Sequence, residues 1–348
     1  MSRCRVTIIV PIYNLENYIP TFFKDLEKQT FQSFKIIAID DFSSDNSLNM
    51  LLDYKEKHYL KIVVLNNSEN LGPGLTKDVG LDSGFIEGDY VLFLDGDDRF
   101  EADFLEKMVE NADESNADIT VCGFDRFDDK SGEVYSKEMV NNHPDYIVNL
   151  TSNDKFAYIN PSLWNKLYRR DLIKDLHFSN VKRGEDLIFL LYLFPRIQSI
   201  KFINEILIHY RVRYGSLINT TNEMSFDIFL NDLINLKKYY LQLNNNKQYI
   251  EILELVVFIH LGISYTYRLV SNDRKKKLYY IKNTKDCLDR YFPGWRKNRY
   301  LNIKHCVFGG SKKIGLWGCR LLYKINMFGV FIKVYLFIIE KLKIDIKW

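Results

Sequence analysis

The feature that most constrains the fold is an alternation of short apolar runs and amphipathic stretches over the first hundred residues. Runs rich in β-branched residues predict strands at 6–10, 34–39, 61–65 and 90–94. Amphipathic stretches between them predict helices near 22–28, 47–57 and 74–83. Strands separated by helices form a parallel sheet with helices on both of its faces. This half of the chain is therefore expected to be an α/β structure.

The rest of the chain has a different pattern. Residues 101–220 are mixed, and they predict a strand, a polar loop and a helix at 118–124, 125–142 and 185–194. From about residue 224 the pattern becomes long and helical, and it predicts two helices at 226–243 and 249–270. We therefore expect the chain to divide into four segments: 1–100, 101–222, 223–310 and 311–348.

Composition limits the class of protein. Apolar residues make up 47% and charged residues 27% of the 348, which is typical of a globular protein and not of a disordered chain. The five cysteines are odd in number and scattered, so a reducing cytoplasm fits better than a disulfide framework or a zinc site. The first apolar run is too short for a signal peptide. With a net charge of only +3, no nucleic-acid partner is expected.

Polar side chains follow the predicted strands, at the edge where open parallel sheets bind their ligands. They are Tyr13 and Asn14, Asp40 and Asp41, Asn66 and Asn67, and Asp95, Asp97 and Asp98. Because the carboxyl ends of parallel strands meet at one edge, these groups are expected to form a single acidic rim. Such a rim suits a metal ion and a polar ligand.

The most specific part of this rim is Asp95-Gly96-Asp97-Asp98, in which three carboxylates surround a glycine. Carboxylates this close repel one another unless a cation lies among them. Oxygen ligands of this kind favour Mg²⁺ or Mn²⁺, which would neutralise charge on a diphosphate leaving group. The alternative is an acidic turn in which Asp97 or Asp98 caps a helix at 101–109.

Several segments, taken in order, resemble the family-2 glycosyltransferases, which have a GT-A type fold. They are 7–14 (TIIVPIYN), 29–31 (QTF), 39–45 (IDDFSSD) and the D-x-D element at 95–98. The resemblance implies a Rossmann-like, mostly parallel sheet followed here by a helical C-terminal domain. It assigns residues 1–100 to the nucleotide-binding half and 101–222 to the acceptor-binding half.

The resemblance also implies a nucleotide diphosphate sugar as the donor. Pro11 and Tyr13 would flank the base, and Asp41 would accept a hydrogen bond from the ring N–H. The other donor residues on the rim would be Asn67, Asp95 and Asp97, and the metal ligands would be Asp97 and Asp98. These roles are chemically reasonable, because a tyrosine ring stacks on a base and a carboxylate accepts an imide proton. Core packing of Tyr13 and turn capping by Asp41 are the alternatives.

A glycine-rich segment at 70–80 resembles the family's turn into a helix, with one departure. Members of the family place Arg-Asn where this chain has Lys77-Asp78. A lysine meets a phosphate as a point charge without the two-pronged fork of arginine. Lys77 is accordingly predicted to contact the donor.

Two adjacent acids, Glu185 and Asp186, open a predicted helix and resemble the family's acidic pair. Asp186 matches the position of the catalytic base, which takes the proton of the acceptor hydroxyl as that oxygen attacks the anomeric carbon. Glu185 would orient that base or the acceptor. The alternative is that both acids are in the first helical turn because of the helix dipole.

Two further segments resemble parts of the family. In 161–170, Trp164 would stack on an acceptor sugar, and packing in the interior is the alternative. In 208–216, Arg213 and Ser216 would donate to the donor diphosphate from a closing loop, and a plain edge strand is the alternative. Alternation along a strand places Arg211 on the same face as Arg213. His209 is a weaker candidate as a metal ligand.

The C-terminal segment 311–348 is basic and apolar, with eight Lys or Arg residues against two acids. Charges interrupt every window long enough to span a bilayer. The segment predicts a pair of amphipathic helices broken near Gly329, lying either on an anionic membrane surface or against the protein itself or a second subunit.

The sequence thus predicts an inverting glycosyltransferase that uses Mn²⁺ or Mg²⁺ and a nucleotide sugar, with a UDP-sugar as first choice. The acceptor is expected to be a hydroxyl of a surface polysaccharide, a glycolipid or a lipid-linked precursor. The expected location is the cytoplasm, with peripheral contact to the membrane, and a homo-oligomer is an open alternative. A sugar nucleotidyltransferase and a non-catalytic carbohydrate-binding relative are the competing interpretations.

Overall fold

The computed structural model describes residues 3–57, 60–140, 145–150, 154–180, 184–213, 222–307 and 310–342. The chain forms two compact units. The sheet unit comprises Met1–Leu150 and Ile159–Ser216, and the helical unit comprises Thr151–Tyr158 and Leu217–Trp348. The segment Thr151–Tyr158 therefore belongs to the helical unit, and the chain returns to the sheet unit at Ile159.

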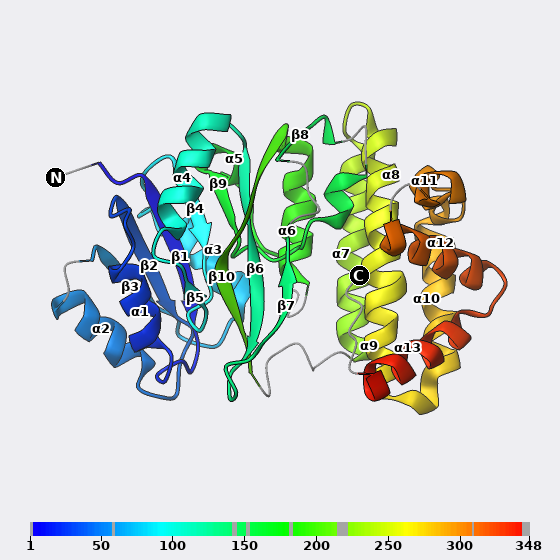
Figure 1. The fold of residues 1–348 in the computed structure, drawn as a ribbon, viewed down its shortest axis with the longest axis horizontal. Coiled ribbons are helices and arrows are strands. Elements are labelled where there is room, and N and C mark those ends of the chain that lie inside the picture. The colour runs from blue at the N-terminus through cyan, green and yellow to red at the C-terminus, as the bar shows by residue number, and fades with distance from the viewer. Residues whose placement is uncertain are drawn as a thin grey trace. The chain divides into compact units, whose positions relative to one another are not determined.

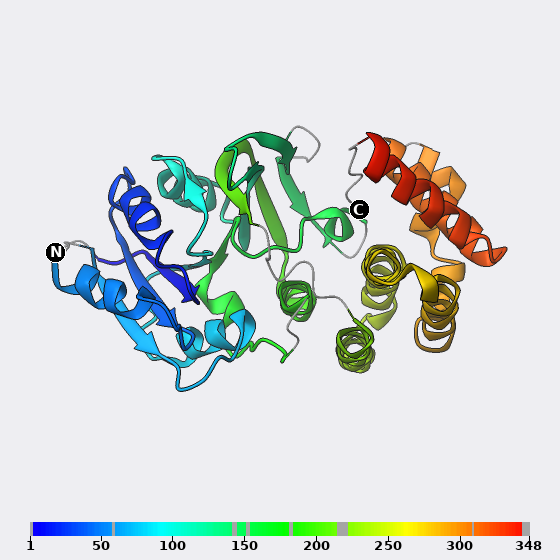
Figure 2. The same ribbon diagram turned by 90° about the horizontal axis from the view of Figure 1, so that it is seen from below.

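The sheet unit contains one mixed sheet of ten strands with helices on its faces (Figures 1 and 2). Its strands are β1 (Val6–Ile12), β2 (Phe34–Asp40), β3 (Ile62–Asn66), β4 (Tyr90–Phe93), β5 (Arg99–Phe100), β6 (Ile119–Asp128), β7 (Val134–Glu138), β8 (Tyr146–Val148), β9 (Lys166–Arg169) and β10 (Ser199–Val212). Its helices are α1 (Ile19–Glu27), α2 (Ser47–Lys57), α3 (Pro73–Asp82), α4 (Phe104–Ser115), α5 (Arg170–Ile173) and α6 (Glu185–Leu193). The main strand order is β3-β2-β1-β4-β9-β6-β10-β5.

The four strands of the first half are parallel, as the alternating pattern predicts. Strands β1 and β4 lie in the middle of the path and are buried along almost their whole length. Burial on both faces explains why these runs are continuously apolar and not alternating. The predicted fold class, a mostly parallel α/β sheet with a helical C-terminal region, is confirmed.

The second half of the sheet departs from the sequence predictions in two places. The polar loop predicted at 125–142 contains strand β7, which pairs with an extended β6 as a hairpin. The segment around residue 168, for which no strand was predicted, forms strand β9 between β4 and β6, antiparallel to both. A four-residue strand is too short to show a clear period in the sequence.

The helical unit consists mainly of helices (Figure 1). They are α7 (Glu223–Leu241), α8 (Asn246–Val257), a π-helical segment (Phe258–Tyr265), α9 (Thr266–Asn272), α10 (Lys277–Tyr291), α11 (Ile303–Val307), α12 (Gly310–Lys324) and α13 (Phe328–Leu342). The continuous run Asn246–Asn272 is, by length and composition, apolar enough to cross a membrane. However, 72% of its most apolar window is buried inside the protein, as in a central core helix.

The C-terminal segment belongs to this helical core. The Tyr323 hydroxyl of α12 donates to the Gly262 carbonyl, 2.5 Å away in the π-helical segment. Near the start of α12, Lys313 pairs with the buried Asp154 carboxylate, which also lies 2.8 Å from His305 Nε2. The helices break at residues 325–327, so the predicted pair of helices with a break near Gly329 is confirmed.

Candidate active site

The loop that follows β4 carries the acidic element Asp95–Asp98. Its backbone turns tightly, with the Asp98 N–H donating to the Asp95 carbonyl. A Cβ atom added at Gly96 would lie 2.4 Å from Ile12 Cδ1, so any larger residue would displace the Ile12 side chain of β1. Helix α4 begins only at Phe104, too far along the chain for Asp97 or Asp98 to cap it. The helix-cap alternative is therefore wrong.

The three carboxylates of this loop are short of positive charge. Asp98 is 1% exposed; its Oδ1 accepts the Arg211 N–H at 2.9 Å, and its Oδ2 has no hydrogen-bond partner among the described residues. Burial raises the pKa of Asp95 to about 6 and raises the pKa of Asp97 and of Asp98. For Asp98 the neighbouring anions add to the effect of burial.

Two arginines at the end of β10 face this loop. Arg213 Nε lies 2.7 Å from Asp97 Oδ2, and Arg211 Nε donates to the Asp97 carbonyl at 2.7 Å. Both guanidinium groups lie over the Tyr18 ring, at 5.1 and 5.0 Å from its centre. Asp129 accepts from both Arg211 and the Tyr18 hydroxyl. Sequence analysis missed Tyr18 and Asp129, because each lies in a turn without any distinguishing motif.

The acidic pair at the start of α6 approaches the glycine-rich turn at the start of α3. A Cβ atom added at Gly74 would be 3.3 Å from Glu185 Cβ, which is tight contact. Lys77 Nζ of α3 lies 3.0 Å from Asp186 Oδ1, and the Leu163 N–H donates to Asp186 Oδ2 at 3.3 Å. The candidate base is thus held from two sides.

A single lysine connects the acidic pair to the D-x-D loop. Lys77 is 3% exposed, and burial alone would lower its pKa. The carboxylates of Asp186, Asp95 and Glu185 outweigh burial and raise it. Burial, followed by repulsion from Asp186, raises the pKa of Glu185 to about 7. Asp95 and the Glu185-Asp186 pair are distant in the sequence, but their carboxylates all interact with the Lys77 ammonium.

The Asp41 carboxylate organises the neighbouring corner of the rim. Its Oδ1 accepts from Asn67 Nδ2 at 2.9 Å and from the Leu71 N–H at 2.8 Å, and its Oδ2 accepts from the Gly72 N–H at 2.9 Å. Tyr13 directly follows Ile12, which is paired with Asp40 in the sheet, and its side chain is 48% exposed. The rim therefore combines a fixed carboxylate with an accessible aromatic ring, and Tyr13 is not a core residue.

Comparison with known proteins decides the family. Residues 7–177 match the sequence profile described as "Glycosyl transferase family 2". The chain belongs to glycosyltransferase family 2. This result confirms the resemblance carried by the motifs, and it favours glycosyl transfer over the nucleotidyltransferase and non-catalytic interpretations.

Individual proteins resemble this glycosyltransferase over part of the chain in sequence and over 95% of it in fold. Glycosyltransferase GlyA of Streptococcus pneumoniae serotype 4 is 30% identical over 229 residues, which are 63% of this chain but only 32% of GlyA. S. aureus TarS 1–349 in complex with UDP-GlcNAc has a similar fold, with a TM-score of 0.70 at 20% identity over 95% of this chain and 91% of that chain. The mannosyltransferase PcManGT from Pyrobaculum calidifontis, in complex with GDP-Man and Mn²⁺, has a TM-score of 0.53 at 14% identity, over 95% and 85% of the two chains.

Two residues singled out in the glycosyltransferase sequence have other contacts than the predicted ones, and a third is not described. Trp164 is buried between an edge-on Phe124 ring and a stacked Tyr210 ring, so it does not offer a face to an acceptor sugar. His209 lies between Asp125 and Glu101, at 2.9 and 3.1 Å, and not on the D-x-D loop. Ser216 lies outside the described residues.

Lys77 and Pro11 complete the predicted set. Lys77 is buried on Asp186, so in this structure its ammonium is directed to the candidate base and not to an open phosphate site. Pro11 is half-buried near the end of β1, beside Tyr13. The neighbouring Asp78 accepts the Phe178 N–H with both oxygens, at 2.9 and 3.0 Å, and therefore has a structural contact.

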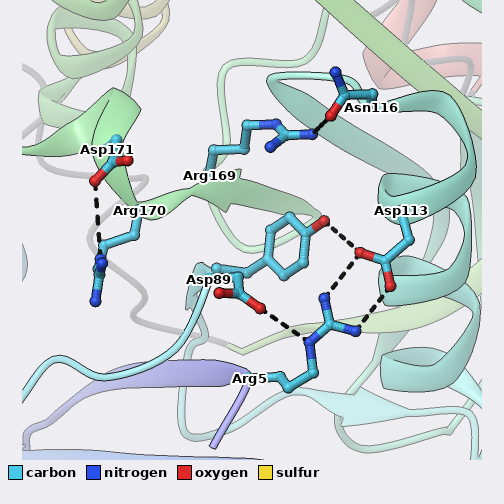
Figure 3. A pocket seen from close by; sticks show the side chains of 8 residues that line it. Arg5, Asp89, Asp113, Asn116, Arg169, Arg170 and Asp171 are labelled. Atoms are coloured by element: carbon cyan, nitrogen blue, oxygen red, sulfur yellow. Dashed lines mark hydrogen bonds and ion pairs between the residues drawn. The ribbon is translucent and has the colours of Figure 1, made fainter.

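At the opposite, amino-terminal edge of the sheet lies a polar cavity of about 330 Å³. Figure 3 shows Arg5 bridging Asp89 and Asp113, with the Tyr90 hydroxyl also donating to Asp113. Arg169 donates from its Nε to the Ala117 carbonyl. Asp89 and Asp113 are both paired with Arg5 here, whereas on the D-x-D rim the buried Asp98 Oδ2 has no hydrogen-bond partner among the described residues.

Proposed function

We propose that the chain transfers a sugar, with inversion, from a nucleotide diphosphate sugar to an acceptor hydroxyl, with Asp186 as the general base. The observation that carries the proposal is the position of Lys77. This one buried cation is 3.0 Å from Asp186 and also interacts with Asp95 of the D-x-D loop. A base and a donor-binding loop must face one reacting centre, and their shared partner supports that arrangement.

The donor is assigned to the rim formed by β1, β2 and the D-x-D loop. The Tyr13 ring would stack on the base beside Pro11, with Asp41 and Asn67 at its edge. An ionised carboxylate has about four acceptor sites, and three N–H groups occupy those of Asp41, so one remains for a uracil imide. A UDP-sugar is our first choice, supported by the similar fold of TarS, which was solved with UDP-GlcNAc.

A divalent metal fits the D-x-D loop. The described residues contain no group of three or more His, Cys, Asp or Glu side chains that would cage an ion. A nucleotide site does not need one, because Mg²⁺ is commonly held by one or two carboxylates together with substrate phosphates. The unpartnered Asp98 Oδ2, together with the raised pKa values of Asp97 and Asp98, supports this proposal. Mn²⁺ or Mg²⁺ on Asp97 and Asp98 would supply charge neutralisation of the leaving diphosphate.

The side chains of the chain itself supply the remaining steps. Asp186 takes the proton from the acceptor hydroxyl, and the Lys77 ammonium and the Leu163 N–H orient that carboxylate. Glu185 is placed beside it to orient the acceptor. Arg213, together with Ser216, is assigned to the departing diphosphate, because a guanidinium fork matches phosphate oxygens.

The acceptor is proposed to be a hydroxyl of a cell-surface polysaccharide, a glycolipid or a lipid-linked precursor, reached from the cytoplasm. A sequence relative supports this class: TarS of Staphylococcus aureus, a poly(ribitol-phosphate) β-N-acetylglucosaminyltransferase, is 27% identical over 214 residues. With Trp164 buried, the acceptor surface has to be formed by other residues near Glu185.

The test is a thermal-shift screen of UDP-sugars and GDP-sugars with and without Mn²⁺, followed by a transfer assay on Asp186→Asn. We expect metal-dependent donor binding that this substitution leaves intact, while transfer falls about a hundredfold or more. The matched control is Asp171→Asn, an almost fully exposed acid on α5, which should leave both unchanged. Normal transfer by Asp186→Asn would disprove the assignment of the base.

A further inference from the structure

The last two helices of the helical unit have an inner apolar face that is fully used. Their buried inner residues are Leu316, Cys319 and Tyr323 on α12 and Phe328, Ile332 and Tyr335 on α13. The Tyr323 hydroxyl also donates a hydrogen bond to the Gly262 carbonyl of the π-helical segment. Packing of the hairpin against its own domain, one of the two alternatives for the tail, therefore accounts for one face of each helix.

The outer face of the same helices carries a second apolar stripe. We call it the outer stripe; its residues are Ile314, Leu321, Ile325, Met327, Val330, Val334 and Phe337, each 42–59% exposed. On α13 the spacing is i, i+4, i+7, and across α12 it is i, i+7, i+11, both of which place the residues on one side of a helix. Single exposed apolar residues are ordinary, but a regular stripe along two consecutive helices indicates a binding surface.

Positive charge borders the outer stripe. Lys324 and Lys333 are exposed on α12 and α13. Arg320, Arg296 and Lys297 lie close enough to Lys324 to help burial lower its pKa. At the start of α13, a Cβ atom on Gly329 would be 3.8 Å from Lys277 Cε, which adds a third lysine near this helix. The surface is therefore apolar in the middle and cationic at its margin.

We propose that the outer stripe and its lysines dock the helical unit on the surface of an anionic lipid membrane. Apolar side chains would enter the boundary between headgroups and acyl chains, and the lysines would extend to lipid phosphates. A symmetric pairing of two copies would instead bring basic margins together, and protein interfaces exclude lysine from their centres. Each helix has 15 residues, too few to span the bilayer. This inference does not depend on the proposed catalytic roles.

The experiment is flotation of the full chain with neutral phosphatidylcholine vesicles and with vesicles containing about a third phosphatidylglycerol. The wild type should float with the anionic vesicles only, and 0.5 M salt should weaken the association. The triple variant Val330→Ser, Val334→Ser, Phe337→Ser should bind at least tenfold more weakly. Leu241→Ser, an equally exposed leucine at the end of α7, is the matched control and should bind as the wild type.

The charge contribution is tested separately with Lys324→Glu, Lys333→Glu, whose exposed side chains should not be required for folding. This variant should also lose at least tenfold in binding, with an unchanged unfolding temperature. Equal flotation of all variants, or equal flotation with neutral and anionic vesicles, would overturn the proposal. So would a doubled mass in sedimentation, without vesicles, that the triple variant abolishes, because the stripe would then pair two copies.

Discussion

The two edges of the parallel sheet use the same residue types with opposite results. At the amino-terminal edge, Arg5 forms hydrogen bonds to Asp113 that lower the pKa of that carboxyl. At the carboxyl-terminal edge, burial raises the pKa of Asp95, Asp97 and Asp98. Arginine and aspartate are present at both edges. At the amino-terminal edge, Arg5 is paired with both Asp89 and Asp113 (Figure 3), whereas at the other edge Asp98 Oδ2 has no hydrogen-bond partner among the described residues.

This difference separates charge that stabilises the fold from charge that is available for chemistry. Paired acids at the amino edge gain from ionisation, whereas the acids of the D-x-D loop lose solvation without full compensation. Such a deficit is expected where a cation and a nucleotide supply the missing interactions on binding. The comparison therefore predicts that substitutions at the carboxyl-terminal edge change activity, whereas substitutions at the amino-terminal edge change stability only.

The largest expected effect is on activity, from Asp97→Asn. Removing this carboxylate should abolish metal-dependent donor binding and lower transfer by about a thousandfold, or about 4 kcal/mol. Stability in EDTA should stay the same or rise, because repulsion within the loop decreases. Asp113→Asn is the control and should change transfer less than twofold. A similar loss of activity in both variants would remove the distinction between the edges.

A buried cation should matter more to stability than an exposed one, which Lys77→Met tests. Removing the ammonium leaves Asp186 beside Asp95 and Glu185 without their shared partner, at a cost of about 2–3 kcal/mol of unfolding free energy at pH 8. Lys57→Met is the control, since Lys57 also pairs with an acid, Asp53, but both side chains are more than half exposed. It should cost under about 0.5 kcal/mol in urea unfolding.

The parallel half of the sheet could be predicted because its signals are local. Each strand is a β-branched run that ends in polar residues, and Gly96 is fixed by the need for a tight turn beside Ile12. The resemblance to the family then gave the predicted roles of the D-x-D loop, Tyr13 and Asp186. These roles stay predictions, but the structure shows that the Asp95 and Asp186 carboxylates both interact with the Lys77 ammonium.

The missed features depend on contacts between distant segments. Tyr18 and Asp129 are 111 positions apart, and only the fold places them together beneath Arg211. Lys77 resembles a phosphate ligand in sequence, whereas its partner Asp186 lies 109 positions away. Trp164 was misjudged because an aromatic ring gives the same sequence signal in a core and on a sugar-binding surface.

Acidification should affect the two edges in opposite directions, which the metal-free protein in EDTA can show. The raised pKa of Asp95, about 6 against an ordinary value near 4, means that the folded state holds this proton more tightly than the unfolded state. Its contribution to stability is present below pH 4 and is lost as the pH rises to 6. The free energy of unfolding of Asp95→Asn, measured in urea, should therefore rise by roughly 1–2 kcal/mol relative to that of the wild type between pH 4 and pH 7. A constant difference across this range would contradict the pKa assignment.

The smallest effect is expected at the amino edge, from Asp113→Asn. The lowered pKa of Asp113 means that its ionised form stabilises the fold above pH 4, and this contribution is lost as the pH falls through the folded-state value. The side chain is 42% exposed, so solvent screening limits the cost of the substitution to about 1 kcal/mol at pH 7. The difference from the wild type should shrink in 0.5 M salt and vanish at pH 2–3. A cost that persists in acid would show that the Tyr90 hydroxyl, and not the Arg5 charge, is the main partner of this carboxyl.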